Sequence, residues 1–178
     1  MNRAVVVLAG LALLAPAPLP AQAPADKGES ARPIAALGWL VGGVWTADAS
    51  KLGPGMQRVE TRYQWADNNA YVRFNTHFVL DKGTLNNYDG NLFWNPERKT
   101  LAIWYMDSGN SIIEGPIELQ GEGFSVTFRG TNFEGKLADL RVDVSRKTPD
   151  LYHWAVAEKQ GEGWKPLAEL DYRRLAGS

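Results

Sequence analysis

Few residues of this chain have a type and spacing that could carry out catalysis or bind a metal. Cysteine is absent, and there are only two histidines, His77 and His153. No serine lies in a Gly-x-Ser-x-Gly motif, so the sequence predicts no hydrolase triad. There is no His-x-x-x-His pair for zinc and no acidic loop with calcium spacing. We therefore predict no catalytic residues and no bound metal.

A histidine inside a β-barrel could still serve as an axial ligand of haem. His153 lies between Tyr152 and Trp154, which alternation assigns to the apolar, inward face of a predicted strand. Successive side chains of a strand point to opposite faces, so His153 should point outward. His77 shares a face with polar neighbours and should point outward as well. We therefore expect no cofactor and keep haem binding as an alternative.

Carboxylates could supply general acid–base catalysis if they converged in a cavity. Asp107 and Glu114 belong to one predicted hairpin, and Glu60 and Arg62 lie on an earlier strand. An inward arginine could instead bind the carboxylate of a ligand. We expect these charged residues to form cross-strand pairs on the outer face. An enzyme remains an alternative, and it requires one of these side chains or His153 to point inward.

These residues lie on about ten predicted strands joined by short links. Val59, Thr61, Tyr63 and Trp65, for example, alternate with polar residues, as is typical of a half-buried strand. The predicted strands are 43–49, 57–66, 70–80, 88–94, 100–106, 111–119, 124–131, 136–145, 151–158 and 164–174, with a polar loop at 81–87 and a short helical segment at 33–41. No link is long enough for a crossover helix, which excludes parallel βαβ units. The sequence predicts an all-β fold, a single up-and-down antiparallel β-barrel with a short N-terminal helix.

The aromatic content is high, with seven tryptophans, six tyrosines and six phenylalanines. If the apolar faces point inward, aromatic side chains line the lumen as a ligand-binding site. The predicted ligand-binding residues are Tyr63, Trp65, Phe74, Phe78, Trp104, Phe128, Tyr152 and Trp154. Side chains alone can fill a barrel of about eight strands, so a wider one should hold a cavity, with a packed core as the alternative. The strand 100–106 is apolar on both faces, which leaves open an outer patch at Ile103 and Tyr105.

Short motifs in the chain resemble those of calycin-like bacterial β-barrels, the architecture of lipocalins and fatty-acid-binding proteins. The segment Leu-Val-Gly-Gly-Val-Trp at 40–45 is similar to their Leu-x-Gly-x-Trp start. Trp-Asn-Pro at 94–96 and Asp-Ser-Gly at 107–109 resemble the central hairpin, and Tyr-Arg-Arg at 172–174 is similar to the closing Tyr-x-Arg. The resemblance covers most of residues 34–174. It implies a container for a small apolar molecule.

The same resemblance implies a structural pair. In calycins an early tryptophan closes one end of the barrel, and a late arginine packs across its ring. Trp45 matches the tryptophan. Arg174 is the expected partner because it is in phase with Leu170 and Tyr172, and Arg173 is the alternative. A cation over an indole face contributes about 0.5–2 kcal/mol, depending on burial.

The N-terminal residues predict export. Residues 1–23 have the pattern of a signal peptide, with a positive start, an apolar run too short to span a bilayer and cleavage near Ala21 or Ala23. Residues 24–32 are small and polar and predict a disordered lead-in to a barrel domain at 33–178. We expect a secreted or periplasmic protein whose mature chain has no membrane span.

The charge balance argues against a nucleic-acid partner. Nineteen Lys and Arg residues stand against 20 Asp and Glu, so there is no basic excess. We predict an exported monomer that binds a small hydrophobic or amphipathic ligand in its lumen. The alternatives are a barrel enzyme of isomerase, cyclase or hydrolase type, a haem-binding nitrobindin-like barrel, and an interaction protein with a filled core.

Overall fold

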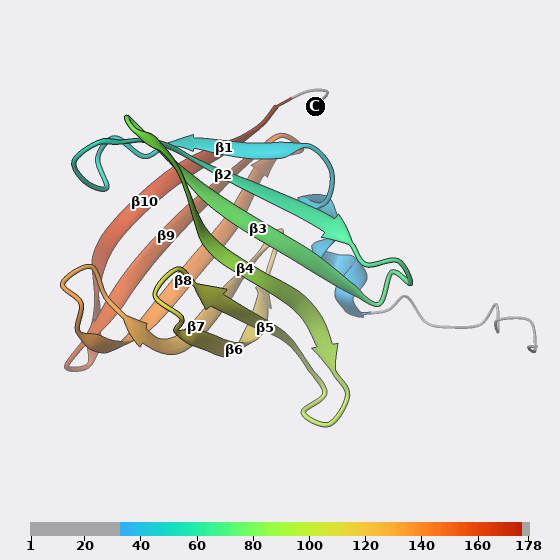
Figure 1. Cartoon of the computed structure of the whole chain (residues 1–178). Helices are drawn as coiled ribbons and strands as arrows, with labels where there is room; N and C mark the ends of the chain where they lie inside the picture. Colours follow the sequence, from blue (N-terminus) through green and yellow to red (C-terminus); the bar gives the residue numbers. More distant parts are fainter. Residues whose placement is uncertain (1–32, 176–178) are drawn as a thin grey trace, which may run out of the picture. The chain divides into compact units, whose positions relative to one another are not determined.

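The computed structural model describes residues 33–175, which form a closed β-barrel. Each strand pairs antiparallel with its neighbours in sequence, and β1 closes the barrel against β10 (Figure 1). The strands are β1 (Val44–Asp48), β2 (Met56–Trp65), β3 (Tyr71–Leu80), β4 (Gly83–Asn95), β5 (Thr100–Asp107), β6 (Ile112–Gln120), β7 (Gly123–Thr131), β8 (Leu137–Thr148), β9 (Leu151–Gln160) and β10 (Gly163–Leu175). The predicted up-and-down barrel is confirmed. The predicted signal peptide at 1–23 and lead-in at 24–32 lie outside the described residues.

The start of β4 differs from the prediction. The polar loop predicted at 81–87 is wrong, because β4 begins at Gly83, directly opposite Leu80 of β3. Gly83 has a φ of 135°, which allows two residues to turn the chain. A register shift between Thr76 and His77 then keeps the polar segment paired with β3. Most of its side chains are exposed, so alternation cannot detect this part of the strand.

The chain enters the barrel through a 3₁₀ helix, η1 (Pro33–Leu40), which lies at one end of the barrel (Figure 1). Proline suits the first helical position because the N–H that it lacks would have no helical partner there. Ile34, Leu37 and Leu40 are buried and belong to the hydrophobic core. The predicted helical segment is therefore confirmed. In the part of the chain that the structure describes, no helix is long and apolar enough to cross a membrane.

Two glycines turn the chain from η1 into β1. Gly42 and Gly43 have φ values of 94° and 71°, in a region that residues with a side chain rarely adopt. A Cβ atom on Gly43 would also lie 3.1 Å from Cγ of Arg174 and 3.2 Å from the carbonyl oxygen of Leu175. The glycines of this motif therefore allow the turn and leave room for Arg174.

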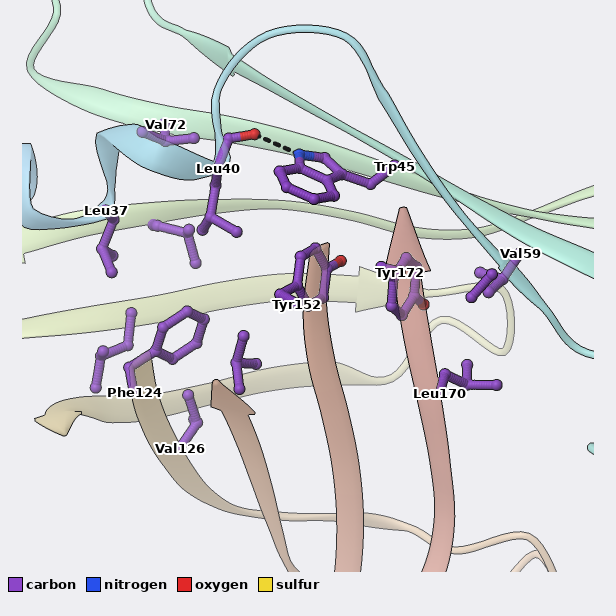
Figure 2. Close-up of a cluster of buried hydrophobic side chains, with 14 of the residues drawn as sticks. Leu37, Leu40, Trp45, Val59, Val72, Phe124, Val126, Tyr152, Leu170 and Tyr172 are labelled. Carbon is purple, nitrogen blue, oxygen red and sulfur yellow. Dashed lines mark hydrogen bonds between the residues drawn. The ribbon is translucent and has the colours of Figure 1, made fainter. Parts of the chain in front are cut away.

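Trp45 and Arg174 lie opposite each other on β1 and β10. Trp45 is fully buried, and the guanidinium carbon of Arg174 is 4.4 Å from the centre of its ring. The indole Nε1 donates a 2.7 Å hydrogen bond to the carbonyl oxygen of Leu40 (Figure 2). Nη2 and Nη1 of Arg174 donate to the carbonyl oxygens of Trp39 at 2.6 Å and Val41 at 3.1 Å. The pair thus satisfies three consecutive carbonyl groups at the end of η1, where helical partners are missing.

Aromatic rings surround this pair. The ring of Trp39 is edge-on to Trp45 at 6.2 Å and to Tyr152 at 5.8 Å. Tyr152 stacks on Tyr172, with ring centres 4.7 Å apart, and Figure 2 shows both beside Trp45. The rings and η1 together fill this end of the barrel with side chains.

Replacement of Arg174 by methionine should destabilise the barrel. The variant Arg174→Met keeps a long apolar side chain against Trp45 but leaves the carbonyls of Trp39 and Val41 without their donors. Each unsatisfied buried group costs about 1–3 kcal/mol, so we expect urea denaturation to show a loss of about 2–5 kcal/mol in the free energy of unfolding. Arg173→Met is the matched control, because Arg173 is exposed on the other face of β10. Equal losses in both variants would contradict this role of Arg174.

Candidate functional site

A cavity of about 200 Å³ lies inside the barrel. Tyr152, whose ring centre is 4.8 Å from that of Trp45, and its stacking partner Tyr172 line it at the end closed by η1. Asn132 and Phe133 line it at the other end, in the loop between β7 and β8. The remaining lining comes mostly from apolar side chains of the strands. The lumen is therefore closed by η1 at one end and bordered by loops at the other.

Six of the eight predicted ligand-binding residues line this cavity. They are Tyr63, Phe74, Phe78, Phe128, Tyr152 and Trp154. Trp65 packs against η1 instead, since a Cβ atom on Gly38 would lie 3.3 Å from its Cζ2. It therefore belongs to the closed end of the barrel. Ligand binding by these residues stays a prediction.

The inward orientation predicted for Trp104 is wrong. Trp104 lies opposite Asn91 of β4 and Glu114 of β6 on the outer face, whereas Ile103 and Tyr105 line the cavity. Ile103 and Tyr105 thus do not form the outer patch that the sequence left open. Alternation could not decide the phase of this strand because both of its faces are apolar. Only its pairing with neighbouring strands determines which face points inward.

The lumen carries more hydroxyl groups than the sequence prediction included. Five tyrosines line it, and Tyr88, Tyr105 and Tyr172 are not among the predicted ligand-binding residues. Thr61 and Thr76 line it too, and their Oγ1 atoms are 2.9 Å apart. The sequence did carry a signal for these threonines. Thr61 lies two residues from inward Tyr63, and Thr76 lies two residues from inward Phe74, and residues two apart on a strand share a face. Threonine and tyrosine are also common on outer faces, so their residue types did not point inward.

Four of these hydroxyl groups lie in two neighbouring pairs. Tyr63 lies near enough to Tyr152, and Tyr172 near enough to Thr61, for their hydroxyl groups to interact. Thr61, Tyr152 and Tyr172 are buried and Tyr63 is partly buried, so these contacts replace water that the hydroxyl groups lose on folding. These pairs connect β2 with β9 and β10 across the lumen.

Tyr105 differs from these paired residues. Its ring is in contact with Phe74, Tyr88 and Phe128, at centre-to-centre distances of 6.0, 5.1 and 6.2 Å. Among the described residues, however, its hydroxyl group has no hydrogen-bond partner. Tyr105 therefore presents an unused donor and acceptor at the wall of the cavity.

Burial raises the pKa values of the lumen tyrosines. The pKa of Tyr63 rises to about 12, and that of Tyr152 lies well above its usual value. The pKa values of Tyr88, Tyr105 and Tyr172 are raised as well, chiefly because contact with water is lost. All five side chains therefore stay neutral at physiological pH. They can donate or accept hydrogen bonds, but they are not anions.

The candidate acid–base residues do not converge in the lumen. Glu60 and Glu114 form ion pairs with arginines on the outer face, at 2.7 and 3.3 Å. Asp107 lines the cavity at its rim, where its Oδ1 accepts 2.8 Å hydrogen bonds from the backbone N–H groups of Gly109 and Ser111. This carboxylate is thus used by the β5–β6 hairpin turn.

Both histidines lie on the outer face, as the sequence predicted. Nδ1 of His153 is 2.9 Å from Oδ1 of Asp171, and His77 lies opposite Glu60. No histidine, lysine or arginine is among the described residues that line the cavity. Within residues 33–175 there is also no group of three or more His, Asp or Glu side chains that could hold a metal ion. The residues present do not fit a histidine-ligated haem in the lumen.

A second hollow, of about 570 Å³, lies on the outer face over β2 to β5. Arg62 and Trp104 line it together with several amide side chains. Nδ2 of Asn75 donates hydrogen bonds to Asn86 and Asp89 across the register shift between β3 and β4. Much of the polar character of this hollow is therefore explained by the pairing of β3 with the polar start of β4.

No protein-family model and no curated protein matches this chain. A closed antiparallel barrel of ten strands is compatible with a calycin-like fold. Beyond this topology, the likeness to calycins rests on the short motifs of the sequence.

The buried tyrosines predict a loss of stability at alkaline pH. The pKa of Tyr63 in the folded chain is about 12, above its usual value of 10.0, and the pKa values of the other four tyrosines are raised as well. The contribution of these tyrosines to the free energy of unfolding is complete below about pH 10. It is lost as the pH rises further, because the unfolded chain then binds fewer protons than the folded one. Tyrosinate absorbance of the native protein should lag behind that of the urea-unfolded chain. Coincident titration curves would show that the rings are not buried.

Proposed function

We propose that this protein is an exported barrel of the calycin-like type that holds a small hydrophobic or amphipathic molecule in its lumen. The main support is the cavity of about 200 Å³, lined mostly by apolar and aromatic side chains and closed at one end by η1. Removal of apolar surface from water, at about 25 cal/mol per Å², would supply the affinity. A few polar groups at the wall would set the orientation of the ligand.

Inward side chains that remain partly accessible support an unfilled lumen. Ile103 and Val142 point into the barrel and line the cavity, yet neither is fully buried. By contrast, Val59 on the same inner surface is almost completely covered by its neighbours. The accessible surface of Ile103 and Val142 is the surface that a ligand would cover.

The cavity volume limits the size of the ligand. An apolar cavity of about 150 Å³ can hold benzene, so a slightly larger one admits a molecule of roughly ten non-hydrogen atoms. A long-chain fatty acid would need side chains to move. The expected occupant is therefore smaller than the usual ligands of fatty-acid-binding barrels.

The lumen supports a container better than the other functions considered. An enzyme would need polar groups that converge on a substrate, and Asp107 already accepts hydrogen bonds in its own hairpin. A filled-core interaction protein would not need an accessible cavity. Export is part of the proposal, and it rests on the sequence of residues 1–23.

Native mass spectrometry of the exported protein is the direct test. We expect a stoichiometric small molecule bound to the purified protein, and extraction would identify its chemical class. If the protein is empty, it should still bind at least one member of a panel of small hydrocarbons, alcohols and carboxylic acids in calorimetry. An empty protein that binds none of them would contradict the container function.

A lumen-filling variant locates the site. Ile103→Trp should abolish binding because the indole occupies the cavity, while circular dichroism still shows the β-barrel. Ile112→Trp is the matched control, since Ile112 is 61% exposed and does not line the cavity. Binding that survives in a folded Ile103→Trp variant would place the ligand outside the lumen.

A further inference from the structure

The charges around the lumen are unfavourable for an anionic ligand. No lysine, arginine or histidine is among the described residues that line the cavity. Its one carboxylate, Asp107, lies at the rim and would repel a second negative charge. A ligand carboxylate would thus lose its water without gaining a cation, and an unpaired buried charge is strongly unfavourable.

The lumen tyrosines report on the same environment. The pKa values of all five are raised, and the first cause in each case is the loss of water around the phenolate. Whatever disfavours a phenolate at this wall also disfavours a carboxylate beside it. These shifts agree with the absence of basic side chains from the described lining.

A neutral polar group has a place to bind. The hydroxyl groups of Tyr63 and Tyr152 interact with each other, and that of Tyr172 interacts with Thr61. The hydroxyl group of Tyr105 has no such partner among the described residues, and its partly buried side chain lines the cavity wall. A hydroxyl group that a ligand covers needs a hydrogen-bond partner, so a ligand oxygen would pair with this one.

We propose that the lumen selects a small uncharged molecule with one hydrogen-bonding oxygen, a hydroxyl or a carbonyl, which meets the hydroxyl group of Tyr105. This inference rests on the proposed container function and narrows it to a ligand class. A hydrocarbon of the same shape would fit the cavity but would leave the Tyr105 hydroxyl unpaired. A carboxylate of the same shape would fit but would stay charged in an apolar site.

Geraniol and geranic acid form a matched pair for testing charge, because they share a carbon skeleton. At pH 7 we expect calorimetry to show that geraniol binds at least about 30-fold more tightly than the acid. The affinity of the acid should rise about tenfold for each unit that the pH falls toward its own pKa, since one unit corresponds to a factor of ten. The titratable groups that face the lumen are Asp107 and the five tyrosines. Geraniol controls for them, and its affinity should not change over this range.

A tyrosine variant tests the polar contact. Tyr105→Phe should weaken the binding of geraniol about tenfold and leave that of the hydrocarbon myrcene unchanged, because a net hydrogen bond is worth roughly that factor. Tyr71→Phe is the control, since Tyr71 lies on the outer face of β3 and its hydroxyl group accepts a hydrogen bond from Arg73. Equal weakening of geraniol and myrcene would indicate a packing effect and would overturn the role of Tyr105.

The outcomes separate this inference from the proposed function. If geranic acid binds as tightly as geraniol at pH 7, the container function stands and selection for a neutral ligand is refuted. If neither of them binds, nor any member of the wider panel, the container function fails and this inference fails with it. Tighter binding of geraniol, lost in part only with Tyr105→Phe, supports both.

Discussion

Three backbone carbonyls at the end of η1 need hydrogen-bond donors, and the rest of the structure depends on how they obtain them. The indole of Trp45 and the guanidinium of Arg174 supply all three. Nε of Arg174 also lies 3.4 Å from Oδ1 of Asp150 in the β8–β9 turn, an ion-pair distance without hydrogen-bond geometry. Because Trp45 is on the first strand and Arg174 on the last, the contact that holds the helix is also at the seam that closes the barrel.

This constraint shapes the lumen. With η1 and its aromatic neighbours packed at one end, the cavity is bordered by loops only at the other. Rings on the inner surface reduce the remaining space to about 200 Å³, although a barrel of this strand number is wide. The hydroxyl groups on these rings stay neutral because burial raises their pKa values. The result is a small apolar space with hydrogen-bonding groups and, within the described lining, no positive charge.

Sequence reasoning succeeded where one face of a strand is clearly polar. His153 and its neighbours Tyr152 and Trp154 were assigned correctly because apolar and charged residues alternate there. Arg174, rather than Arg173, packs on Trp45 because it is in phase with Leu170 and Tyr172. The direction of Trp104 was predicted wrongly, since a strand with two apolar faces has no phase of its own. The start of β4 was not predicted either, because its mostly exposed polar residues pair with β3 without an apolar face that alternation could detect.

The sequence by itself determined the number of strands, their order around the barrel and the direction of most side chains, because a period of two residues and short links leave few other arrangements. Only the tertiary structure decided which face of β5 points inward, how much of the lumen the rings fill and which hydroxyl groups meet. These properties depend on residues far apart in the chain. The contact between Tyr63 and Tyr152, and the unpaired hydroxyl of Tyr105, exist only because barrel closure brings β2, β5 and β9 around one small space.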